Sequence, residues 1–193
     1  MRKYVNTLPI LFLLLICAST VNGQTEKKLS KPIFGILAGG TLSNISNYDA
    51  ENRLGFVIGL YVERNFTEKL SLLSNISYAQ RGAIGKDSLS SIKLDYITIP
   101  IMIQYYISDK VGIFTGIAWD GLISIKGDGL DRNDFRDDDW RIPVGLGYSI
   151  SSNLKLGIAY NFGLTDITRN DNEKLRNNWG SIALVYVFKK KKN

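Results

Sequence analysis

The most constraining feature of the sequence is a strict alternation of residue types across residues 140–162. From Trp140 to Ile150, large apolar side chains occupy every second position, and glycine, proline, serine and arginine stand between them. A short polar segment at residues 151–153 interrupts the pattern, which resumes at Leu154 and continues to Phe162. Because side chains alternate between the two faces of a strand, this spacing predicts a β-hairpin with one apolar face and one face of small and polar groups.

Similar alternation along the chain predicts eight strands, at residues 32–41, 54–66, 69–81, 94–106, 111–122, 140–150, 154–162 and 179–188. Three connections are expected to be tight turns, near Thr67, Asp109 and Ser152. The other four are expected to be long polar loops, which begin near Leu42, Gly82, Ile123 and Gly163. Short turns that alternate with long loops are typical of bacterial outer-membrane barrels, in which the short turns face the periplasm. We therefore predict an all-β fold, an eight-stranded antiparallel up-and-down transmembrane β-barrel.

Several positions in the predicted strands carry further expectations. Pro100 lacks a backbone donor, so a bulge or a missing hydrogen bond is expected there. Leu73 and Ser74 interrupt the alternation locally. Aromatic residues near both ends of the strands predict girdles at the two membrane interfaces: Trp119, Trp140 and Trp179 on the long-loop side, and Phe66, Tyr105 and Phe188 on the short-turn side.

The two ends of the chain differ from the middle. Arg2 and Lys3 precede an apolar core at residues 8–18, and small residues lead up to Gly23, which is the pattern of a cleavable signal peptide. An uncleaved membrane anchor is the alternative. We predict a signal peptide at residues 1–23, a barrel domain at 24–188 and a basic tail at 189–193. The tail is interpreted as solvated, with contact to anionic headgroups or the cell wall as the alternative.

The composition excludes several classes of function. Of the net charge of +6, the signal peptide contributes two positive charges through Arg2 and Lys3, and the tail lysines contribute four, so the predicted barrel is close to neutral and gives no indication of nucleic-acid binding. The chain has no histidine, and its one cysteine, Cys17, lies in the predicted signal peptide. Ser-His-Asp and Cys-His catalysis and His- or Cys-ligated zinc or haem are thereby excluded. We predict no enzyme activity, no cofactor, and no catalytic, cofactor-binding or metal residues.

Charged residues also occur on the predicted inner face of the barrel, namely Glu63, Arg81, Asp120, Arg141 and Lys155. Eight strands leave an interior just wide enough for side chains. The favoured interpretation is an ion-paired plug that fills the lumen. A polar channel or a binding site is the alternative.

Aspartates cluster in the third long loop, at Asp128, Asp131, Asp134, Asp137, Asp138 and Asp139. Calcium prefers such oxygen ligands. The spacing does not match an EF-hand loop, and Lys126, Arg132 and Arg136 lie among the aspartates. A solvated loop is therefore favoured over a calcium site.

Several segments carry a resemblance to a known family. They are the end of the signal peptide at residues 22–24, the glycine-rich segment at 34–40 with Leu42-Ser43-Asn44 after it, the segment 94–101, and the closing segment 185–188. On these segments the chain resembles the PorT-like outer-membrane β-barrel family of Bacteroidota (outer membrane protein beta-barrel domain). The resemblance implies a barrel in the outer membrane and a link to secretion.

Together these features predict a small outer-membrane barrel with a side-chain-filled lumen and a structural or interaction role through its extracellular loops. The expected partners are outer-membrane lipid, the barrel assembly machinery during insertion, and a protein at the extracellular loops, with no nucleic acid. Two alternatives stay open. One is a narrow pore or transport barrel, and the other is a soluble lipocalin-like ligand-binding barrel in the periplasm, whose apolar face would point inward.

Overall fold

The computed structural model describes residues 30–46, 50–85, 91–127, 131–169 and 175–188. The predicted signal peptide with Cys17, the basic tail and Asp128 lie outside these described residues. A short 3-10 helix, η1, covers Arg132–Asp134. The strands are β1 (Ile33–Ser46), β2 (Ala50–Asn65), β3 (Leu70–Gly85), β4 (Ile92–Tyr106), β5 (Val111–Lys126), β6 (Asp138–Ser149), β7 (Leu154–Gly163) and β8 (Arg176–Val187).

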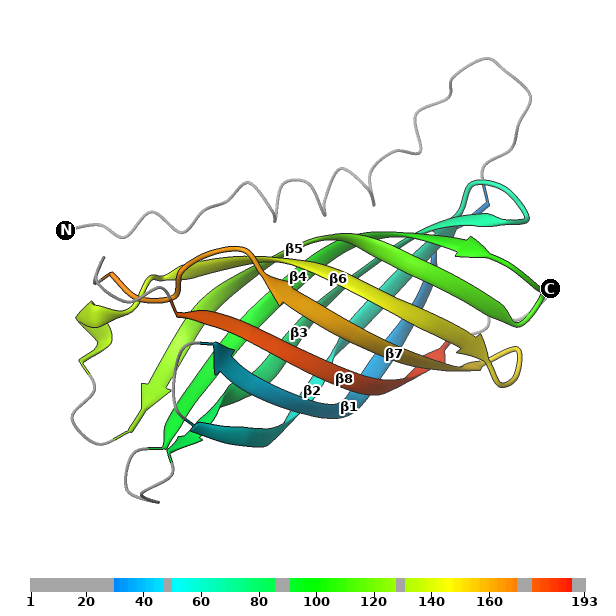
Figure 1. Cartoon of the computed structure of the whole chain (residues 1–193). Helices are drawn as coiled ribbons and strands as arrows, with labels where there is room; N and C mark the ends of the chain where they lie inside the picture. The colour runs from blue at the N-terminus through cyan, green and yellow to red at the C-terminus, as the bar shows by residue number, and fades with distance from the viewer. Residues whose placement is uncertain (1–29, 47–49, 86–90, 128–130, 170–174, 189–193) are drawn as a thin grey trace, which may run out of the picture.

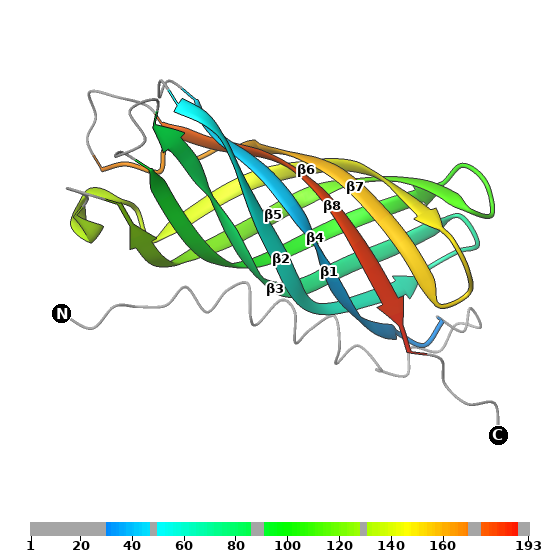
Figure 2. The ribbon, with the colours of Figure 1, turned by 90° about the horizontal axis from the view of Figure 1, so that it is seen from below.

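The strands form one closed sheet, which confirms the predicted fold class. Each strand pairs antiparallel with the next, and β8 returns to pair with β1 (Figure 1, Figure 2). The start of β1 and the end of β8 lie at the same end of the barrel as the three tight turns (Figure 1). In bacterial outer-membrane barrels this end faces the periplasm, and the long loops face outward.

Several strands extend further toward the long loops than their sequence pattern predicts. β3 ends at Gly85 and β5 at Lys126, beyond the predicted ends at Arg81 and Leu122. The added residues continue the pairing with β4, and Ala83 is fully buried there. Burial at this end stabilises strand positions that the sequence pattern assigns to loops.

The outer surface of the barrel is apolar. Val144, Leu146 and Ile158 are 46%, 53% and 51% exposed, whereas their small neighbours Gly145 and Ala159 occupy the opposite face. In water, a continuous belt of such side chains would be an extended exposed apolar patch. In a bilayer it is the expected lipid-facing surface. This arrangement is the reverse of a lipocalin-like barrel, in which the apolar face lines the interior.

The three tight turns are confirmed, and they share one arrangement. In each turn a side-chain hydroxyl accepts a hydrogen bond from the backbone N–H three residues later, at 3.0–3.1 Å. These hydroxyls belong to Thr67, Ser108 and Ser151. Hydroxyl groups that bond the local backbone in this way favour turns over continued strand.

Two prolines interrupt the sheet locally. The pairs between β3 and β4 stop opposite Pro100, and those between β5 and β6 stop opposite Pro143, while each proline stays paired on its other side. The missing bond predicted at Pro100 therefore lies on its β3 side, and the bulge of this strand pair lies elsewhere, at Ile123 of β5 opposite Asp95 and Tyr96. The alternation is interrupted at Leu73 and Ser74, as expected: apolar Leu73 lines the lumen, and the next residue, Ser74, is 1% exposed and donates its hydroxyl to the carbonyl of Pro100 at 2.7 Å.

Candidate functional site

The outer half of the lumen is filled by a buried ionic cluster. Asp120 on β5 accepts hydrogen bonds from Arg81 Nη1 at 2.6 Å and from Arg141 Nε at 2.8 Å. The side chains of Asp120 and Arg81 are 0% exposed. Arg141 also donates to Thr98 Oγ1 at 2.7 Å and to Asn161 Oδ1. The cluster therefore joins β3, β4, β5, β6 and β7 across the lumen.

Trp179 packs against the two arginines of this cluster, and its position differs from the prediction that it belongs to the membrane-interface girdle. The guanidinium carbons of Arg81 and Arg141 lie 4.2 and 4.8 Å from the centre of a Trp179 ring, and Arg81 also lies 4.7 Å from the ring centre of Tyr96. Contacts of this kind between arginine and aromatic faces are attractive, more so when they are shielded from water. Trp179 was expected in the lipid-facing girdle, but its side chain points into the lumen because it shares a face with Ser181.

A second ionic group closes the inner half of the lumen. Lys155 Nζ on β7 pairs with the carboxylate of Glu63 on β2. Tyr61 and Tyr106 donate their hydroxyls to the two oxygens of that carboxylate, both at 2.9 Å. Glu63 is 1% exposed, so these partners satisfy a carboxylate that burial would otherwise strongly disfavour.

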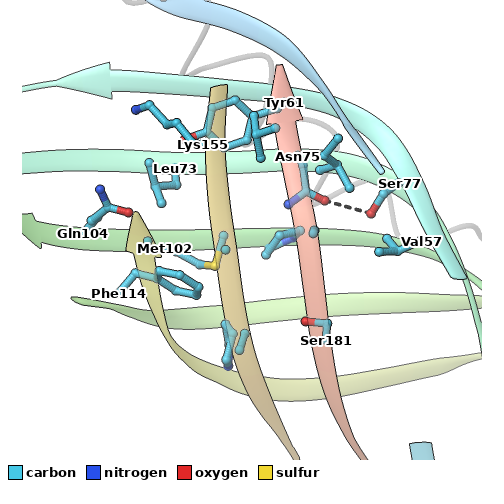
Figure 3. A pocket seen from close by; sticks show the side chains of 18 of the residues that line it. Val57, Tyr61, Leu73, Asn75, Ser77, Met102, Gln104, Phe114, Lys155 and Ser181 are labelled. Carbon is cyan, nitrogen blue, oxygen red and sulfur yellow. Dashed lines mark hydrogen bonds between the residues drawn. The ribbon is translucent and has the colours of Figure 1, made fainter. Parts of the chain in front are cut away.

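The five charged residues predicted on the inner face are thus all inside the barrel, as two separate ion-paired groups. A cavity of about 140 Å³ lies between the groups. Figure 3 shows part of its lining, including Leu73, Met102, Phe114 and Gln104. An open vestibule of about 980 Å³ at the short-turn end shares Lys155 and Ser149 with this cavity.

The long-loop end of the barrel carries an ordered cap, which the sequence predicts only as polar loop. Phe135, Ile167 and Leu175 are buried there against strand residues, among them Ile45 and Ile92. Backbone hydrogen bonds join the two loops, from Arg136 N to the Ile167 carbonyl at 2.9 Å and from Arg169 N to the Asp134 carbonyl at 2.8 Å. The cap covers the outer mouth of the barrel with apolar side chains.

The aspartates of the third loop do not share one site. Asp131 caps η1, Asp137 pairs with Arg132 and Arg169, and Asp139 lies buried at the start of β6. Within the described residues, no group of three or more His, Cys, Asp or Glu side chains is placed to hold a metal ion.

Asp166 organises the fourth loop. Partial burial tends to raise the pKa of Asp166, but hydrogen bonds outweigh this effect and lower it below its ordinary value. The donors are the backbone N–H and hydroxyl of Thr168, at 3.2 and 3.0 Å, and the backbone N–H of Leu175, at 3.0 Å. An ionised Asp166 therefore holds the two sides of this loop together.

The closed barrel, its apolar outer face and its filled lumen define a small outer-membrane β-barrel protein. Residues 24–169 match the family described as outer membrane protein beta-barrel domain, and the chain belongs to this family. This match confirms the broad family predicted from the sequence and the outer-membrane location. The narrower PorT-like group of Bacteroidota stays a prediction. In the described part of the chain, no helix has the length and apolar character to span a membrane.

Solved structures support the same fold. The chain is similar to Ail, the attachment invasion locus protein of Yersinia pestis, with 14% identity and a TM-score of 0.53 over 82% of this chain and 100% of that chain. It is also similar to Neisserial surface protein A, with 13% identity and a TM-score of 0.53 over 84% of this chain and 100% of that chain. At these identities the likeness concerns the fold alone. No curated protein matches the chain.

Proposed function

We propose that this protein is a plugged outer-membrane barrel that acts through its structure and its extracellular loops, without catalysis and without free solute flow. The observation that carries the proposal is the pair of ionic groups inside the lumen. Asp120 holds arginines from two other strands, and Glu63 holds a lysine and two tyrosines. Eight strands leave little lumen beyond these side chains.

The ordered cap supports a role in contact with a partner. Asp134 and Arg136 are exposed on loops whose backbones are joined by hydrogen bonds and whose apolar side chains are buried. A surface that is already ordered loses less conformational entropy on binding than a loose loop does. The proposed partner is therefore a protein or surface component that meets the cap from outside.

Planar-bilayer conductance tests the plugged lumen. The wild-type barrel is expected to give no stable open state. Asp120→Ala, which removes the bridging carboxylate, is expected to raise the frequency of brief openings, whereas Asp137→Ala, in an exposed pair on the cap, is not. Stable open-state currents from the wild type would contradict the proposal and favour the narrow-pore alternative.

Photo-crosslinking in cells tests the role of the loops. A photoreactive amino acid at Asp134 on the cap is expected to give discrete adducts, and the same residue at Glu68 in a short turn serves as the matched periplasmic control. Adducts at Glu68 alone would contradict a partner at the cap.

Two narrower proposals rest on the family resemblance. Insertion by the barrel assembly machinery predicts that depletion of that machinery removes the heat-modifiable band from the outer-membrane fraction. A link to secretion predicts that deletion of the gene changes the set of exported proteins in the culture medium. An unchanged band or an unchanged set of exported proteins would count against the corresponding proposal.

A further inference from the structure

The cavity between the two ionic groups is large enough for a ring molecule. Its volume is about 140 Å³, and its walls are mainly apolar, formed by Leu37, Val57, Leu73, Met102, Phe114 and Val185. A protein cavity of about 150 Å³ lined by Leu, Ile and Phe binds benzene. Arg141 and Trp179 form the outer end of the cavity here, and Tyr61 and Lys155 lie at its inner end.

Gln104 presents a side-chain amide to this cavity. Gln104 is 5% exposed and lines the cavity, and its amide has no hydrogen-bond partner among the described residues. It lies against Gly112 and Gly147, since a methyl group added at either glycine would come within 2.8–2.9 Å of the Gln104 side chain. The amide atoms of Gln104 are not among the fully enclosed side-chain atoms that lack a partner, so a molecule in the cavity can reach them and form a hydrogen bond.

The charged side chains at the two ends of the cavity already have hydrogen-bond partners. Each guanidinium nitrogen of Arg141 is bonded to Asp120, Thr98 or Asn161. Lys155 is paired with Glu63. A charged ligand would lose its hydration on entering this mainly apolar space and would find these partners already engaged, whereas a neutral ligand loses little.

Access to the cavity is asymmetric. The outer side is blocked by the Asp120 cluster and, beyond it, by the buried side chains of the cap. On the inner side Lys155 lines both the cavity and the vestibule, and its side chain is 20% exposed. Since Ser149 also lines both spaces, the cavity and the vestibule adjoin on this side.

We propose that the lumen cavity binds a small neutral molecule with a benzene-sized apolar body and one hydrogen-bonding group, taken up from the short-turn side. The apolar body fills the space among Leu73, Met102 and Phe114. The polar group bonds to the amide of Gln104. Ser181, whose hydroxyl lines the same cavity, lies on β8 (Figure 3).

Ligand-observed ¹⁹F NMR on the barrel in lipid nanodiscs tests this site, with 4-fluorophenol and fluorobenzene as probes. Empty nanodiscs correct for partition of the probes into lipid. Saturable binding of both probes is expected, with 4-fluorophenol binding more tightly. Probe signals that match those of empty nanodiscs would show a cavity that holds only water, and would overturn the proposal.

Paired variants place the binding inside the lumen. Ser181→Phe fills the cavity with a ring and is expected to lower the binding affinity of both probes at least tenfold. Ile182→Phe lies on the lipid-facing side of the same strand. The affinities of both probes for this variant are expected to stay within twofold of the wild-type values. Equal binding by wild type and Ser181→Phe would mean that the probes bind to the lipid-facing surface, and it would refute the proposed site in the lumen.

Gln104→Leu tests the polar contact and does not depend on whether Ser181→Phe folds. It is expected to lower the affinity for 4-fluorophenol about tenfold and to leave the affinity for fluorobenzene within twofold, because only the phenol forms a hydrogen bond with the amide. Unchanged 4-fluorophenol binding would refute the proposed hydrogen bond. A heat-modifiable band on gel electrophoresis confirms the fold of each variant.

Discussion

Removal of the Asp120 carboxylate is expected to be among the most destabilising single changes in the barrel. Asp120 bridges two arginines at 2.6 and 2.8 Å, and the Asp120 and Arg81 side chains are fully buried. When one partner of a buried ion pair is removed, the remaining buried charge typically costs about 3–5 kcal/mol. Asp120→Ala leaves two such charges. However, Arg141 keeps its bonds to Thr98 and Asn161, so we expect one cost of about 3–5 kcal/mol and not twice that.

Reversible urea unfolding in lipid vesicles, followed by tryptophan fluorescence and by gel migration without heating, measures this cost. Asp137→Ala is the matched control, because Asp137 also pairs with two arginines but is 48% exposed. That change is expected to cost about 0–1 kcal/mol. Replacement of Arg81, Asp120 and Arg141 together by Met, Leu and Met is expected to cost less than Asp120→Ala alone, since none of these three groups then remains as a charge without its partner.

A loss below about 1 kcal/mol for Asp120→Ala, equal to that of Asp137→Ala, would refute this reasoning. It would mean that water reaches the cluster and that the plug is not desolvated. A triple variant less stable than Asp120→Ala would show that packing, and not charge, holds this part of the lumen.

Three further predictions concern the lipid face, the cap and pH. Val144→Arg, on the lipid-facing side of β6, is expected to cost about 2–4 kcal/mol in vesicle unfolding; insertion and stability like the parent would reverse the assigned orientation. Phe135→Ala is expected to destabilise the cap by about 3 kcal/mol and to speed its hydrogen exchange about a hundredfold, with the barrel unfolding midpoint unchanged; unchanged exchange in the cap would contradict its packing. Because the pKa of Asp166 is lowered in the folded protein, its stabilisation is present above the ordinary carboxyl pKa of about 4 and is lost as pH falls through the lowered value. Protection of this loop from exchange should therefore hold from neutral pH to about pH 5 and fall in stronger acid, while Asp166→Asn should remove that dependence; an equal fall in both proteins would implicate another group.

The sequence predicts the strands, the turns and the direction of most side chains because these depend on local alternation. The period-2 pattern around Val144 and Ile158 assigns the lipid face correctly, and the hydroxyls of the three turns mark where strands reverse. The same pattern already implies that Trp179 points inward, since Ser181 does. The girdle prediction fails for Trp179 because it used position along the strand without the face.

Other features depend on neighbours that are distant in the chain. Glu63 and Lys155 are on β2 and β7, and their pairing is set by the tilt and register of a closed sheet, which alternation does not reveal. The cap is harder still to predict. Phe135 and Ile167 are single apolar residues in polar loops, and no periodicity connects them. Their contact arises only when the strands bring the two loops together.

The asymmetric closure of the barrel divides its residues between two environments. The cap keeps the lumen from the exterior, while at the inner end the Glu63 and Lys155 pair lies next to the open vestibule. Agents outside the cell, such as antibodies, therefore meet only the cap and the loops around it. A substitution at Gln104 is invisible to them, and a substitution at Asp134 leaves the lumen untouched. Surface recognition and lumen chemistry are thus free to evolve independently in a chain of this small size.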